Sequence, residues 1–174
     1  MCEMKMINLY IMIVIPWSGN STWCRHNIKD TDAYVSRDKI RFGLVNPNEP
    51  YFSKENQVYQ EFINTIERKL VKYKNVYADQ TSLDSRARRK LITSLHIKPE
   101  EIHVIWLNTP METCLKYNAL RKGVEKVPEQ TIRQMYGRLE KPTWSEGVKY
   151  LHIISQGKEE IIDLEKEALE EWSL

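Results

Sequence analysis

Glycine, proline and cysteine are scarce in this 174-residue sequence, which holds six glycines, seven prolines and three cysteines. With 41% hydrophobic residues and no glycine- or proline-rich stretch, the chain is not collagen-like, low-complexity or disordered. The cysteines are widely spaced and include no CxxC pair, which predicts reduced thiols in a cytoplasmic protein and no structural zinc. The length suits one compact domain over residues 1–174.

The sequence also lacks a long apolar run and a strong excess of charge of either sign. Its most apolar stretch, residues 9–17, is shorter than the roughly 20 residues that span a bilayer. That stretch continues into serine, glycine and threonine rather than a cleavage site, so we interpret it as a buried strand and not as a signal peptide. A net charge of +2 does not by itself indicate a nucleic-acid binder. We therefore expect a soluble, cytoplasmic protein without a membrane partner.

Short apolar segments alternate with longer amphipathic ones along the chain. Strands are expected at residues 8–15, 33–36, 75–79, 102–107 and 150–154, and helices at 21–28, 54–72, 85–95, 110–120, 128–139 and 158–172. Residues 43–50, rich in asparagine and proline, predict a loop. This alternation predicts βαβ units, and therefore an α/β fold with a mostly parallel sheet. The four histidines are isolated in the sequence, which predicts ordinary structural roles.

The junction between the first strand and the first helix carries the strongest functional signal. A P-loop has the form GxxxxGK[ST]: its amides cradle phosphates, its lysine reaches the terminal phosphates and its hydroxyl binds magnesium. Residues 14–21 (VIPWSGNS) keep only the second glycine and the hydroxyl of this pattern, at Gly19 and Ser21. Val14 and Asn20 replace the first glycine and the lysine. On the pattern alone, a helix capped by Asn20 or Ser21 is an alternative interpretation.

Residues 15–23 (IPWSGNSTW) resemble the xPGSGKSTW loop of phage-type polynucleotide 5′-kinases and their small P-loop kinase relatives, which carry an AAA-like ATPase domain. The resemblance continues, in the family's order, at residues 34–41 (YVSRDKIR), 78–83 (ADQTSL) with the arginines after them, 121–136 and 140–143. It covers most of residues 8–145. It implies a three-layer P-loop NTPase fold, a mostly parallel sheet flanked by helices, with a small helical lid at about residues 121–128.

The resemblance implies ATP-dependent transfer of a phosphoryl group to a hydroxyl, with ATP and Mg²⁺ as cofactors and a 5′-hydroxyl DNA or RNA end as acceptor. Asp38 matches the family's general base, and Arg121 matches the lid arginine that clamps the nucleotide phosphates. The residues implied to bind the nucleotide are Ser18, Gly19, Asn20, Ser21 and Thr22, with Ser21 also holding the metal. Those implied to bind the acceptor are Arg37, Arg41, Asp79 and Arg86.

Structural roles are the alternatives for several of these residues. Asp38 and Asp79 follow predicted strands, where an aspartate often caps a helix, and Asp79 is alternatively part of a magnesium shell. The basic run at residues 86–90 is either a solvated helix face or one wall of an anion-binding cleft.

The loop departs from the family pattern where the phosphates would lie. The Asn20 amide donates a hydrogen bond but carries no charge, and Trp17 and Val14 add bulk in place of glycine. We therefore expect weak ATP binding. Three functions stay open: a polynucleotide kinase, a small-molecule kinase, and a pseudo-kinase that binds nucleotide, nucleic-acid ends or a protein partner without turnover. The pattern fits natural loss of the lysine and a deliberate change of the loop equally.

Overall fold

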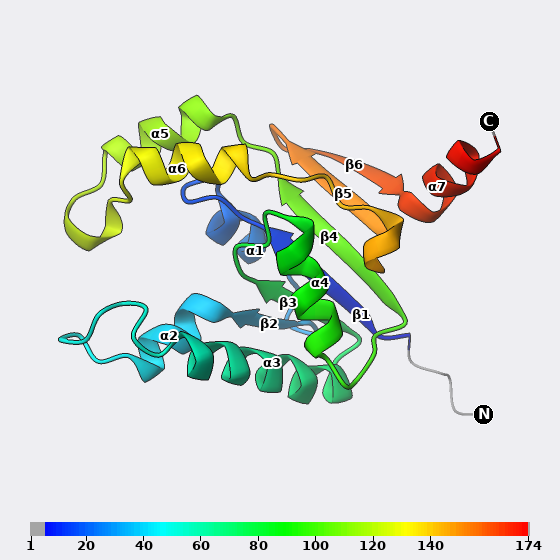
Figure 1. Ribbon diagram of the computed structural model, residues 1–174, viewed down its shortest axis with the longest axis horizontal. Coiled ribbons are helices and arrows are strands. Elements are labelled where there is room, and N and C mark those ends of the chain that lie inside the picture. Colours follow the sequence, from blue (N-terminus) through cyan, green and yellow to red (C-terminus); the bar gives the residue numbers. More distant parts are fainter. Residues whose placement is uncertain (1–5, 174) are drawn as a thin grey trace.

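Six strands form one sheet in the order β2-β3-β1-β4-β5-β6, in a computed structural model that describes residues 6–173 except the side chain of Val124 (Figure 1). The strands are β1 (Asn8–Ile13), β2 (Ala33–Ser36), β3 (Asn75–Asp79), β4 (Glu101–Leu107), β5 (Tyr150–Ser155) and β6 (Lys158–Asp163). All neighbours are parallel except β5 and β6, which are antiparallel. The predicted α/β class with a mostly parallel sheet is confirmed.

The connections between the strands are mostly helical. The helices are α1 (Asn20–Asn27), α2 (Arg37–Leu44), α3 (Glu55–Lys72), α4 (Ser85–Ser94), α5 (Met111–Ala119), α6 (Glu129–Gly137) and α7 (Leu164–Trp172), with 3-10 turns η1 (Gly123–Glu125) and η2 (Trp144–Glu146). Residues 121–128, where the lid is predicted and which we call the lid segment, join α5 to α6 and contain η1. Within residues 6–173, no helix combines the length and apolar character needed to cross a membrane.

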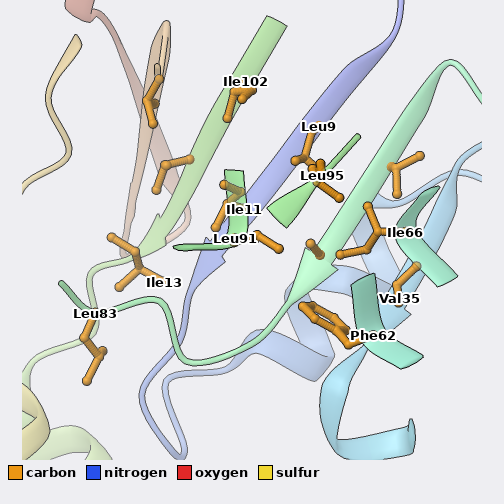
Figure 2. Close-up of a cluster of buried hydrophobic side chains, with 14 of the residues drawn as sticks. Leu9, Ile11, Ile13, Val35, Phe62, Ile66, Leu83, Leu91, Leu95 and Ile102 are labelled. Carbon is orange, nitrogen blue, oxygen red and sulfur yellow. The ribbon is translucent and has the colours of Figure 1, made fainter. Parts of the chain in front are cut away.

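The core lies on both faces of the sheet because side chains alternate along each strand. Figure 2 shows Leu9, Ile11 and Ile13 of β1 on one face, packed in the cluster that includes Phe62 of α3 and Leu91 of α4. On the other face, Met12 packs with Cys24 of α1 and Ile105 of β4 in a smaller cluster. Fully burying a side chain of this size contributes about 1.5–3 kcal/mol. The continuous apolar run of β1 is therefore explained by its position between two layers.

The C-terminal segment differs from the prediction. A single helix over residues 158–172 is wrong, because residues 158–163 form β6 and only the remainder forms α7. Gln156 and Gly157 have φ values of 49° and 76°, a two-residue turn that folds the chain back so that Lys158 pairs with Ser155. The Asp163 carboxylate then accepts a hydrogen bond from the Lys166 amide at 3.0 Å and begins α7.

Two other local differences concern the first half of the chain. The strand predicted over residues 8–15 ends at Ile13, and Val14 and Ile15 are buried in the following loop. Helix α2 is not among the expected helices. It begins because the Ser36 hydroxyl accepts a hydrogen bond from the Lys39 amide, which satisfies one of its free N–H groups.

Two of the histidines that are isolated in the sequence meet in the fold. His103 Nδ1 lies 2.9 Å from His152 Nε2 across β4 and β5. The outer nitrogens of the two rings face carboxylates, with Glu101 at 3.3 Å from His103 and Glu159 at 2.7 Å from His152. Burial and the adjacent His152 ring lower the pKa of His103 from 6.5 to about 4.

Candidate phosphate-binding site

Three segments singled out in the sequence meet at one edge of the sheet. The strands β2, β3 and β1 are neighbours, so their carboxyl ends lie together (Figure 1). Ser36, the last residue of β2, is paired with Asp79, the last residue of β3, and Asp38 follows in the first turn of α2. The loop of residues 14–19 leaves β1 beside them. Ligands of open α/β sheets bind at this edge.

The loop between β1 and α1 turns sharply. Trp17 and Gly19 have φ values of 69° and 94°, both in the left-handed region. The Ser18 amide donates a hydrogen bond to the Ile15 carbonyl at 3.0 Å, which closes the turn. Glycine adopts a positive φ without strain, whereas for another residue it costs about 1–2 kcal/mol. Trp17 therefore holds the loop in a conformation that its own backbone disfavours.

Trp17 is held in place by α5 and the lid segment. Its indole N–H donates a hydrogen bond to Asn118 Oδ1 at 2.9 Å, and the Arg121 guanidinium lies 4.3 Å from its ring centroid. Asn118 is buried, and its amide also bonds the backbone of Val127 in the lid segment through both its N–H and its carbonyl. The predicted clamp Arg121 is thus beside the loop, and it lies against Trp17.

The start of α1 has the features of an anion site. Its N-cap residue, Gly19, provides no side-chain hydrogen bond, and the first turn contains no acidic residue. The first amides of a helix have no partner within the helix and favour negative charge. The buried Ser18 Oγ has no hydrogen-bond partner within the described residues. A phosphate group fits these orphaned donors.

Asn20 stands where the P-loop pattern has lysine, and its side-chain amide lowers the pKa of the neighbouring Asp79 carboxylate. The Tyr34 hydroxyl donates a hydrogen bond to this carboxylate. Burial raises the pKa of Asp79 and the Asp38 carboxylate raises it further, while Tyr34, Asn20 and the Lys39 ammonium act in the opposite direction. Lys39 Nζ lies 5.1 Å from the centroid of the Tyr34 ring, so Lys39 provides a positive charge on the Asp79 side of the site.

Asp38, the predicted general base, has an exposed carboxylate whose orientation is restricted by hydrogen bonds. Its side chain is 67% exposed, and its carboxylate accepts hydrogen bonds from the Arg41 guanidinium and, at 3.1 Å, from the Tyr51 hydroxyl. Arg41 is buried and also pairs with Glu55 at 2.7 Å. Arg37 pairs with the same Glu55 carboxylate at 2.8 Å. Both arginines lie on the Asp38 side of the site, and each is already paired with the Glu55 carboxylate.

The predicted basic run on α4 does not act as one surface. Arg88 is fully buried and forms a bidentate pair with Glu146, at 2.7 and 3.0 Å. Arg89 donates a hydrogen bond to the Ser145 carbonyl at 2.8 Å. Arg86 is exposed and has no hydrogen-bond or ion-pair partner among residues 6–173. Of these arginines, Arg86 is the one left free to meet a ligand.

Several contributors to the site escape sequence reasoning. Thr109, just after β4, donates a hydrogen bond from its hydroxyl to the Ser18 carbonyl at 2.8 Å, and its position after a predicted strand is a signal that could have found it. Asn118, Tyr34 and Glu55 carry no such signal, because their roles depend on neighbours distant in sequence. In the described part of the chain, no group of three or more histidine, cysteine or acidic side chains is arranged to hold a metal.

The strand order, the loop between β1 and α1 and the lid segment define a P-loop NTPase fold of the small-kinase type. A family model described as an AAA domain matches residues 9–142, most of the chain, and the chain belongs to that family. The predicted family and fold are therefore confirmed. Among curated proteins, none matches the sequence at a significant level.

Solved structures of similar fold include both nucleic-acid and small-molecule kinases. A chain of the Pnkp1/Rnl/Hen1 RNA repair complex superposes with a TM-score of 0.62 at 19% identity over 77% of this chain. This chain spans 44% of that one, less than half its length. A fungal RNA kinase has a TM-score of 0.57 at 14% identity, covering 88% of this chain and 76% of that chain. A gluconokinase from Sinorhizobium meliloti 1021 has a TM-score of 0.57 at 15% identity, covering 87% of this chain and 85% of that chain.

Proposed function

We propose that this chain transfers a phosphoryl group from a nucleoside triphosphate to a hydroxyl, with the 5′-hydroxyl end of a nucleic acid as acceptor. The observation that carries the proposal is that the uncapped start of α1 and the exposed, oriented Asp38 carboxylate lie at one edge of the sheet. A phosphoryl donor and a hydroxyl acceptor need this pair of sites. The nucleic-acid kinases among the similar structures support the choice of acceptor.

In this proposal the nucleotide phosphates lie over the amides of residues 19–22 and the Ser18 hydroxyl. Magnesium is commonly held by one or two protein oxygens together with substrate phosphates, and Ser21 and Asp79 offer such oxygens. When bound, the metal neutralises charge on the phosphates. Burial raises the pKa of Asp79, and a cation bound there would favour the ionised form of its carboxylate.

Asp38 accepts the proton of the attacking hydroxyl. Its exposed carboxylate can reach an acceptor, while Arg41 and Tyr51 restrict its orientation. Arg121 supplies positive charge from the lid side, and Lys39 supplies it from α2. Neither is placed as the P-loop lysine is, and loss of one preorganised donor typically lowers a rate by about 10²–10³-fold. We therefore expect a slow enzyme.

A second candidate function is binding without turnover. The contact of Trp17 with Asn118 and Arg121 favours it, because this contact ties the loop to α5 and to the lid segment. In that case the chain would bind nucleotide or an acceptor end, and repair of the loop would be needed for any transfer.

The experiment that separates the two is transfer of labelled γ-phosphate from ATP to a 5′-hydroxyl oligonucleotide, with glucose and gluconate as small-molecule acceptors. Activity that falls about 10²–10⁴-fold in Asp38→Asn, and not in the exposed control Asp30→Asn, supports the kinase with Asp38 as base. Activity that appears only in Trp17→Gly/Asn20→Lys supports the non-catalytic reading of the natural loop. Transfer to the sugars alone overturns the proposed acceptor.

A further inference from the structure

Three exposed aromatic side chains lie together beside α2. Phe42 at the end of α2, and Tyr51 and Phe52 in the segment before α3, are 71%, 43% and 67% exposed. The ring centroids are 6.0 Å apart for Phe42 and Tyr51 and 4.8 Å apart for Tyr51 and Phe52, with interplanar angles of 68° and 86°. We call these three residues the aromatic platform.

The exposure of the platform is not explained by packing. Leaving a phenylalanine in water forgoes about 1.5–3 kcal/mol of burial. Other large apolar side chains are exposed, such as Trp172 at 90% on α7, but among residues 6–173 no other exposed aromatic rings contact one another. Figure 1 places α7 and α2 at opposite ends of the molecule. Clustered exposed apolar groups of this kind mark interaction sites.

The platform is continuous with the candidate active site. The Tyr51 hydroxyl donates a hydrogen bond to Asp38 Oδ1 at 3.1 Å. The Arg41 guanidinium, which also bonds Asp38, lies 4.7 Å from the Tyr51 ring centroid and 5.4 Å from that of Phe52. The rings therefore begin where an acceptor hydroxyl would be bound and extend outward from it.

We infer that the aromatic platform stacks the nucleobases of a single-stranded nucleic acid whose 5′ end is presented to Asp38. Aromatic rings bind bases without sequence preference because every base has a π face. The exposed Arg86, in the first turn of α4, offers a charge for the phosphates that follow the first nucleotide. A sugar acceptor has no flat base and would not use the platform. The inference rests on the proposed function for the identity of the acceptor, but binding itself requires no turnover.

The test uses fluorescence anisotropy with two 5′-hydroxyl single strands of ten nucleotides, one complete and one with abasic sites at its first three positions. We expect the unmodified chain to prefer the complete strand by about 5- to 150-fold for each stacked base. The double variant Phe42→Ala/Phe52→Ala should lose this preference. A Phe42→Leu/Phe52→Leu variant, which keeps apolar volume but lacks rings, should lose it as well. The matched control Trp172→Ala, another exposed aromatic, should keep it.

Equal affinity of the unmodified chain for both strands overturns the inference, as does absence of oligonucleotide binding, which would point to a protein as the occupant. An equal loss in Trp172→Ala also overturns it. Circular dichroism and thermal unfolding confirm that each variant is folded. Base-dependent binding without phosphate transfer rejects the proposed reaction but keeps the platform. Transfer at equal rates to complete and abasic strands keeps the reaction and rejects the platform.

Discussion

Replacement of Arg88 by methionine should lower the free energy of unfolding more than almost any other single substitution. The guanidinium is fully buried and donates to both oxygens of Glu146, whose side chain is 1% exposed. It also donates to the carbonyls of Ser82 and Leu83, at 3.1 Å each. Arg88→Met leaves a buried carboxylate without its partner, a change that destabilises by about 3–5 kcal/mol. For a chain of this length the melting temperature should fall by about 6–20 °C.

Urea unfolding followed by circular dichroism measures this effect. The double variant Arg88→Met/Glu146→Leu removes both charges and should be more stable than Arg88→Met, because no unpaired carboxylate is left buried. The exposed neighbour Arg89 provides the control, since Arg89→Met should change stability by less than about 1 kcal/mol. A loss below about 1 kcal/mol in Arg88→Met, or a double variant no more stable than the single, would refute the reasoning.

Three further predictions concern the loop and the sheet. Trp17→Gly/Asn20→Lys should bind ATP with magnesium at least tenfold more tightly than the unmodified chain in calorimetry, because it restores the charge and removes the bulk; unchanged affinity contradicts this. Lys39→Met should weaken nucleotide binding in the natural loop but much less in Asn20→Lys; equal losses in both backgrounds reject Lys39 as the substitute cation. Because the folded pKa of His103, about 4, lies below its ordinary 6.5, the unfolded chain binds more protons between these values. The free energy of unfolding should therefore fall by up to about 3 kcal/mol as the pH is lowered through this window. In His103→Gln, the urea concentration at the midpoint of unfolding should depend less on pH.

Periodicity in the sequence was sufficient to predict the bounds of several strands and helices. Strands β2 and β3 have the predicted bounds, and α3 begins one residue after its predicted start. Their apolar residues recur with the period of the element that they form, so burial and local structure agree. The C-terminal hairpin was missed because residues 158–160, KEE, are polar and favour helix, whereas the Gln156–Gly157 turn sets their structure.

The position of the candidate site was predictable, but its charge balance was not. Strand-end rules and the resemblance bring residues 14–21, Asp38 and Asp79 to one edge of the sheet. They do not reveal that Glu55 pairs with Arg37 and Arg41, since such pairs depend on distances between elements far apart in sequence. For the same reason the sequence does not reveal that Arg88, part of the basic run at residues 86–90, is buried.

The two outer strands differ from the inner ones in a way that bears on association. The edge strand β6 carries exposed charges at Lys158, Glu159 and Glu160, and the opposite edge strand, β2, is only four residues long. Charged or very short edge strands discourage a further strand from adding to a sheet. Pairing of a strand from another chain with β2 or β6 is therefore disfavoured. A partner would instead be recognised by side-chain surfaces such as the aromatic platform.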